Sequence, residues 1–169
     1  MKNLIAAVTT VLGLGATIAT ADNSVLDYDQ MLILDAEDLA EAGIKNAYEK
    51  PKPMMKAHDA KPVELVENID NNLPSYSVSV SGVTYEVYSP ILPGSEGESW
   101  GRATYAFFTI VNSQLEQSPV KFYAINGGND LGGMFLTEQQ ILAAKKSLKN
   151  KTDWPYLPTL EHPWHGQYH

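Results

Sequence analysis

Cysteine is absent from this chain of 169 residues. The absence excludes disulfide bonds, thiolate nucleophiles and thiolate zinc sites. The fold must therefore be stabilised by packing and hydrogen bonds, without the covalent links that exported proteins often carry.

Positive charge is also scarce. Lysine and arginine total 12 against 20 acidic residues, the net charge is −8, and Arg102 is the only arginine. An acidic surface disfavours nucleic acid and anionic membranes as partners, and a single arginine cannot form a cluster that clamps phosphates. The acidity suits a basic partner, or it serves only to keep the protein soluble.

Nucleotide-binding motifs are missing. The sequence has no P-loop and no G-x-G-x-x-G. We name no catalytic residue. After residue 21 no stretch is long or apolar enough to cross a bilayer, because a spanning helix needs about 20 apolar residues.

The first 21 residues have the pattern of a secretory leader. Lys2 precedes an uncharged run from Leu4 to Ile18, and Ala19-Thr20-Ala21 closes it. A basic start, a short apolar core and an A-x-A end predict a cleaved signal peptide over 1–21. A membrane anchor is the alternative, but glycine and threonine interrupt the run. We therefore expect a soluble, periplasmic or secreted protein without a membrane anchor, with 22–169 as one domain.

Helical spacing of apolar residues marks three segments. The first helix is expected to begin at its cap Asp35 and to run without interruption until Pro51, with Glu41 and Lys45 paired on its polar face. A second is predicted over about 99–117, central to the core. A third follows a capping box made by Thr137 and Gln140.

Alternating residues predict two hairpins. A turn at Ser81-Gly82 would pair Val80 with Val83, Val78 with Tyr85 and Tyr76 with Val87, which leaves a serine-rich face in water. Residues 120–125 and 134–136 form the second hairpin, and 50–62 is a proline- and lysine-bearing connection. Whether 63–69 is a strand or a helical turn stays open. We expect an α+β domain in the order helix, hairpin, helix, hairpin, helix, with three helices on one face of an antiparallel sheet.

A glycine-rich loop separates the two strands of the second hairpin. Glycine allows close approach of the backbone to a ligand, so the loop is a candidate anion site, calcium site or insertion into a partner's cleft. Calcium is weakly supported because one carboxylate is few for that ion. The ordinary alternative is a wide turn that needs glycine. The candidate binding residues are Asn126, Gly127, Gly128, Asn129 and Asp130.

Aromatic residues, prolines and histidines crowd the tail over 152–169. Trp154 and Trp164 are candidate binding residues, and His162, His165 and His169 are candidate ligands for Cu(II), Ni(II) or Zn(II). Their spacing matches no closed zinc site, and packing of the tail across the domain is the alternative.

A charged set lies at the start of the second predicted helix, where Trp100 and Arg102 join the binding candidates. Glu96 and Glu98 are nearby. A pair of carboxylates across a cleft is the machinery of a glycosidase, but nothing in the sequence sets their separation.

Three functions therefore stay open. The first is an exported binding or inhibitory protein, of the immunity type, that masks another envelope or secreted protein with a few well-placed aromatic side chains. The second is a periplasmic metal- or small-ligand-binding protein, and the third a peptidoglycan-acting hydrolase. We prefer the first, because the chain is small and acidic and carries a glycine loop and an aromatic tail that together offer a binding face.

Overall fold

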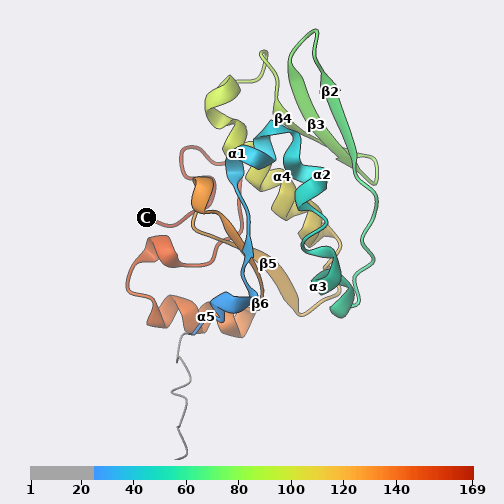
Figure 1. Ribbon diagram of the computed structural model, residues 1–169. Coiled ribbons are helices and arrows are strands. Elements are labelled where there is room, and N and C mark those ends of the chain that lie inside the picture. Colours follow the sequence, from blue (N-terminus) through green and yellow to red (C-terminus); the bar gives the residue numbers. More distant parts are fainter. Residues whose placement is uncertain (1–24) are drawn as a thin grey trace, which may run out of the picture.

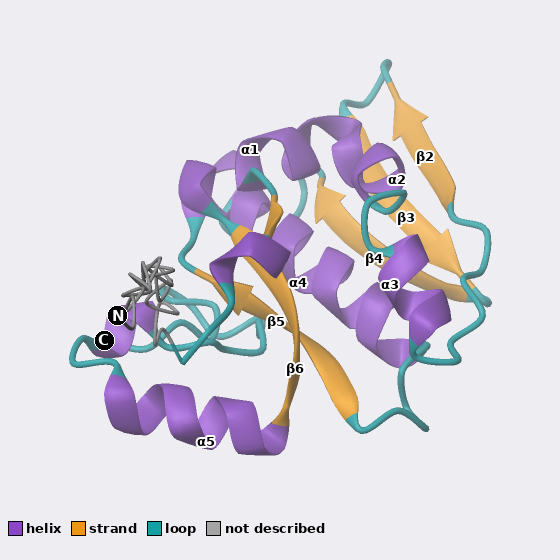
Figure 2. Cartoon of the chain, turned by 60° about the horizontal axis from the view of Figure 1, so that its bottom comes forward, coloured by secondary structure: helices purple, strands orange, loops and turns teal. Residues whose placement is uncertain are grey.

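The computed structural model describes residues 25–169. The predicted signal peptide lies outside the described residues. The chain is an α+β protein with two separate three-stranded antiparallel sheets, and helix α4 (Ser99–Ser113) contacts both of them. Figures 1 and 2 show α4 between the sheet β2–β3–β4 and the hairpin of β5 and β6. No helix within 25–169 is long and apolar enough to cross a membrane.

The first sheet contains β2 (Val66–Asp70), β3 (Ser75–Val80) and β4 (Val83–Tyr88) in chain order. The predicted turn and the Val80–Val83 and Val78–Tyr85 pairs are confirmed. The third predicted pair is wrong, because a register shift next to Tyr76 pairs it with Tyr88 instead of Val87. The shift leaves one extra residue in β4, and an extra residue of this kind bends a strand. Here Val87 is buried while the next side chain is only half-buried.

The second sheet has the order β1 (Leu32–Ile33), β6 (Gly132–Thr137), β5 (Val120–Ile125). The β5–β6 hairpin agrees with expectation, although β6 is longer than predicted. Strand β1 was not expected. The ring of Phe122 lies over Gly133, where an added Cβ would come within 2.1 Å of the ring, so a side chain at this position would displace the ring from the core.

The prediction that the first helix is continuous is wrong. The segment divides into α1 (Ala36–Asp38), a π-helical turn η2 (Leu39–Gly43) and α2 (Ile44–Ala47). Ala42 has a φ of 65°, which removes the segment from regular helical geometry. Glu41 and Lys45 consequently do not pair, and the backbone N–H of Lys45 donates to Glu67 Oε1 at 3.0 Å.

Two further helices depart from expectation, and one agrees with it. The connection over 50–62 contains α3 (Lys52–Ala57). Helix α4 ends earlier than predicted, where the side chain of Gln114 donates to Ile110 O at 2.8 Å. Helix α5 (Glu138–Ser147) begins with the predicted capping box. In place of the expected single sheet of two hairpins with three alternating helices, the described residues form two sheets and more helical segments than expected.

The core has two parts, which lie on opposite faces of the β5–β6 hairpin. The main cluster joins α4 to both sheets, and it includes aromatic rings from α4 and β5 together with Tyr48 and Tyr76. The smaller cluster packs the other face of the hairpin against α5. The two clusters contain the following central residues: Phe107, Phe108 and Phe122 in the first, and Ile125, Met134, Leu136 and Ile141 in the second.

The C-terminal tail is folded onto the second sheet. Tyr156 pairs with Ala124 through two backbone hydrogen bonds, of 2.8 and 3.0 Å. Trp154 packs edge-on against Tyr168, with 5.3 Å between the ring centroids. The hydroxyl of Tyr168 accepts a hydrogen bond from Lys145 of α5. The tail therefore returns along β5 and reaches the N-terminal end of α4.

Candidate functional site

The N-terminal end of α4 is the point where both sheets, the first helical segment and the tail meet. It is preceded by a 3-10 turn, η3 (Ser95–Glu98), and Ser99 donates its hydroxyl to Glu96 O at 2.8 Å. Arg102 donates from Nε to Val87 O at 2.7 Å and from Nη1 to Pro93 O at 3.1 Å. The only arginine thus fastens the loop before α4 to strand β4.

A cavity of about 800 Å³ opens beside this end of the helix. Its walls come from α1 and η2 on one side, from the end of β4, and from η3 with the first turn of α4 on the other. Its lining residues are Glu37, Ala40, Glu41, Tyr88, Glu96, Gly97, Ser99 and Trp100.

The ionisable side chains that line the cavity are all acidic. Three carboxylates face the space together with two aromatic rings, and no lysine or arginine is among the lining residues. Trp100 is 39% exposed, so part of its indole is available for contact. Carboxylates bind cationic groups by charge-assisted hydrogen bonds, and an indole face attracts them further. The cavity therefore suits a lysine, arginine or other cationic group.

The glycine-rich loop supports one wall of this cavity. Asn129 Nδ2 donates to Glu37 Oε2 at 3.2 Å, and Gly128, with φ +61°, lies close to the ring of Trp100. Asn126 adopts φ 56°, and its carbonyl accepts from the buried hydroxyl of Tyr156 at 2.7 Å. The loop thus braces the cavity without lining it.

Two other predicted members of the loop have no comparable role. Gly127 lies near the side chain of Gln167, and Asp130 is exposed. Within 25–169, Asp130 belongs to no group of three acidic or histidine side chains close enough to share a metal ion.

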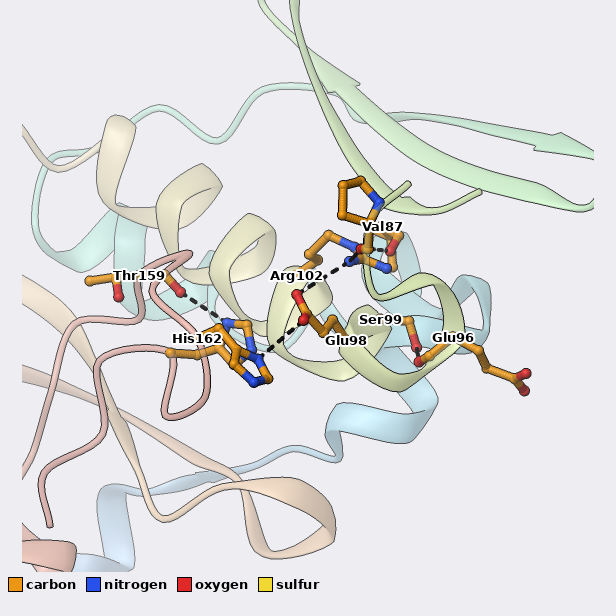
Figure 3. A network of polar contacts seen from close by, with 9 residues as sticks. Val87, Glu96, Glu98, Ser99, Arg102, Thr159 and His162 are labelled. Carbon is orange, nitrogen blue, oxygen red and sulfur yellow. Dashed lines mark hydrogen bonds and ion pairs between the residues drawn. The ribbon is translucent and has the colours of Figure 1, made fainter. Parts of the chain in front are cut away.

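The tail histidines separate into two places. His162 Nδ1 lies 3.1 Å from Glu98 Oε1, and His165 is next to this pair. Glu98 Oε2 is 3.8 Å from Arg102 Nη1, and Figure 3 shows the glutamate between the arginine and His162. His169 is elsewhere, and the centroid of its ring lies 3.5 Å from that of Trp164, with the two rings tilted by 38°.

The predicted tryptophans also separate. Trp100 lines the cavity, whereas Trp154 packs into the domain and donates its N–H to Leu148 O at 3.1 Å. Trp164 is 56% exposed on the tail. Of the predicted binding residues, the structure brings Trp100 together with the glycine loop. It places Arg102 on one side of Glu98, and His162 and His165 close to the same glutamate.

Sequence reasoning missed three of the five charged and aromatic lining residues, namely Glu37, Glu41 and Tyr88. Glu37 and Glu41 have the i, i+4 spacing of a helix face, but this spacing also marks an ordinary solvated surface. Tyr88 reaches the cavity because of the register shift in β4, and no pattern in the sequence predicts that shift.

The two tyrosines whose pKa is most strongly raised lie in the packed part of the fold and do not line the cavity. Burial raises the pKa of Tyr76, and its hydrogen bond to Glu67 raises it further. Burial alone raises the pKa of Tyr156 to about 12. Both hydroxyls are therefore neutral hydrogen-bond donors at physiological pH.

Comparison of the chain with family models, with curated proteins and with solved structures produced no match.

Proposed function

We propose that the protein is an exported, soluble binding protein of the cell envelope that masks a partner protein, as an inhibitor or immunity protein does. The observation that carries the proposal is the acidic, aromatic cavity at the N-terminal end of α4. The leader pattern in 1–21 supports export.

The cavity favours a cationic side chain of the partner as the group that enters it. Its carboxylates come from separate elements, α1, η2 and η3, so they approach the space from different directions. A guanidinium or ammonium group can then meet more than one of them while its flat or apolar part lies on Trp100. A few such buried anchors dominate the affinity of most interfaces.

The net charge supports the same class of partner. At −8, the protein attracts basic surfaces over a distance and accelerates their encounter at low salt. Masking requires a complementary surface and no catalytic residue. Residues 97–101 have the spacing G-x-S-x-G, but Ser99 follows a 3-10 turn and not a strand, and its hydroxyl donates to Glu96 O.

The first test is capture with the immobilised, folded chain from an envelope extract of the native host. We expect one protein to be retained at close to stoichiometric amounts and to elute with salt. Recovery of no protein near that amount contradicts the proposal.

The second test measures the affinity of the captured partner for matched variants. Glu41→Gln and Trp100→Leu should each weaken binding by at least about tenfold, which is about 1.4 kcal/mol. Glu64→Gln makes the same charge change at an exposed site outside the cavity and should leave the affinity nearly unchanged. Equal affinities for all three variants would remove the cavity from the interface.

A further inference from the structure

The tail brings two imidazoles to the carboxylate of Glu98. One possible ligand atom from each of Glu98, His162 and His165 lies within 4.8 Å of the others. In Figure 3 the side chains of Glu98 and His162 point toward each other. Because η3 and the tail are far apart in the sequence, the fold itself creates this group.

Local contacts hold the histidine-bearing part of the tail in place. The N–H of Thr159 donates to His165 O, and the N–H of His165 donates to Glu161 O, both at 2.8 Å. The ring of His165 rests on Gly101 in the first turn of α4, where an added Cβ would lie 2.3 Å from Nε2. The glycine therefore permits the close approach of this imidazole to the helix that follows Glu98.

The group also has the supporting contacts that metal ligands commonly have. His165 Nδ1 lies 3.3 Å from Thr159 O. Arg102 approaches Glu98 Oε2, which leaves Oε1 directed at the histidines. Hydrogen-bond and ion-pair partners of this kind orient ligating imidazoles and carboxylates. The guanidinium adds a positive charge near the site, and the net negative charge of the protein opposes its effect on a cation.

The ligand set selects a class of metal. Two imidazoles and one carboxylate suit Zn(II) and neighbouring divalent transition metals, and they leave a position for water. Zinc bound at its usual distances holds tetrahedral ligand atoms about 3.3 Å apart. The three groups therefore have to close by a small movement, and His162, whose side chain is 64% exposed, can turn to make it.

We infer that Glu98, His162 and His165 form a Zn(II) site that fastens the C-terminal tail to the N-terminal end of α4. His169 is not part of the site, because its ring packs against Trp164. The inference does not depend on the proposed partner. Glu96 lines the cavity, whereas Glu98, two residues later, carries the metal.

The test uses the untagged chain in a buffer that does not bind metals. Isothermal titration with Zn(II) should show one ion per chain, and binding should raise the melting temperature, because a ligand of the folded state stabilises it. Zinc should also slow chymotryptic cleavage in the tail. Mg(II), which prefers oxygen ligands, should neither raise the melting temperature nor slow the cleavage.

Two variants make the test specific. His162→Asn changes an exposed side chain, so the fold should persist, and we expect the zinc affinity to fall by more than about tenfold. His169→Asn removes a neighbouring histidine outside the group and should leave the affinity unchanged. The absence of a one-to-one zinc complex, or equal affinities in the two variants, would overturn the inference. Neither result depends on whether a partner protein is found.

Discussion

The two sheets have the same number of strands and differ in what covers them. One face of β2–β3–β4 packs on the core, and the other carries polar side chains in a row, where Ser79 Oγ lies 3.2 Å from Asn68 Nδ2 and 2.9 Å from Thr84 Oγ1. The β5–β6 hairpin has a core cluster on each face. Strict alternation in a sequence therefore identifies only the half-covered kind of sheet.

The outer edges differ in the same way. Edge strand β2 presents Val66 and Ile69 to solvent, more than half exposed. Edge strand β5 is closed by two other elements: Asn112 of α4 bonds both backbone groups of Phe122, and Tyr156 of the tail bonds both of Ala124. The covered sheet thus carries the tail, and with it the histidines.

The largest loss of stability is expected at Phe122, in the hairpin that is covered on both faces. This ring is fully buried and packs at 4.7 Å from both Phe108 and Phe135. Phe122→Ala should lower the free energy of unfolding by about 4 kcal/mol, measured by urea denaturation. Thr84→Ala on the open face of the other sheet should cost no more than about 0.5 kcal/mol. Similar costs for the two variants would contradict the difference in covering.

A smaller loss is expected where α4 closes the edge of β5. Asn112 donates to Phe122 O and accepts from its N–H, each at 2.8 Å. Asn112→Ala removes both partners and should cost about 2–3 kcal/mol, because buried backbone groups lose their hydrogen bonds.

Hydrogen exchange separates this edge effect from general loss of packing. In Asn112→Asp an acceptor remains for the amide of Phe122, so its exchange should stay slower than in Asn112→Ala. Equal exchange at this amide in the two variants would mean that the side chain does not close the edge.

Local patterns were enough for the parts of the fold whose contacts are local. The Ser81-Gly82 turn, helix α5 with its cap at Thr137, and most of α4 depend on neighbouring residues, and the structure has them as expected. The break at Ala42 and the two-residue strand β1 depend on distant contacts. Strand β1 exists because β6 pairs with it, and no pattern in Leu32 and Ile33 indicates that partner.

The candidate site shows the same division. Trp100 and the histidines stand out in the sequence because aromatic and imidazole side chains are chemically distinctive. Glu37 and Glu41 do not, since exposed acids are common and their role depends on the neighbours that the fold supplies. Only the folded tail distinguishes His162 and His165 from His169.

The smallest predicted effect concerns the tyrosine that attaches the tail to the covered sheet. The pKa of Tyr156 is about 12 in the folded protein against 10.0 for an unperturbed tyrosine. Between these values the unfolded chain releases its proton first, which favours unfolding. The contribution to stability is complete below about pH 10 and is lost as the pH approaches 12.

Stability should therefore fall by about 1 kcal/mol from this residue between about pH 9 and pH 11. Tyr76 of the other sheet, whose pKa is also raised, adds to the slope. Tyr156→Phe loses a hydrogen bond at every pH, so the informative quantity is the slope of the unfolding free energy against pH, which should become shallower. Because Tyr156 bonds a neutral carbonyl and Tyr76 a carboxylate, Tyr76→Phe should flatten the slope further. An unchanged slope in Tyr156→Phe would show that the tail leaves β5 before the hydroxyl ionises.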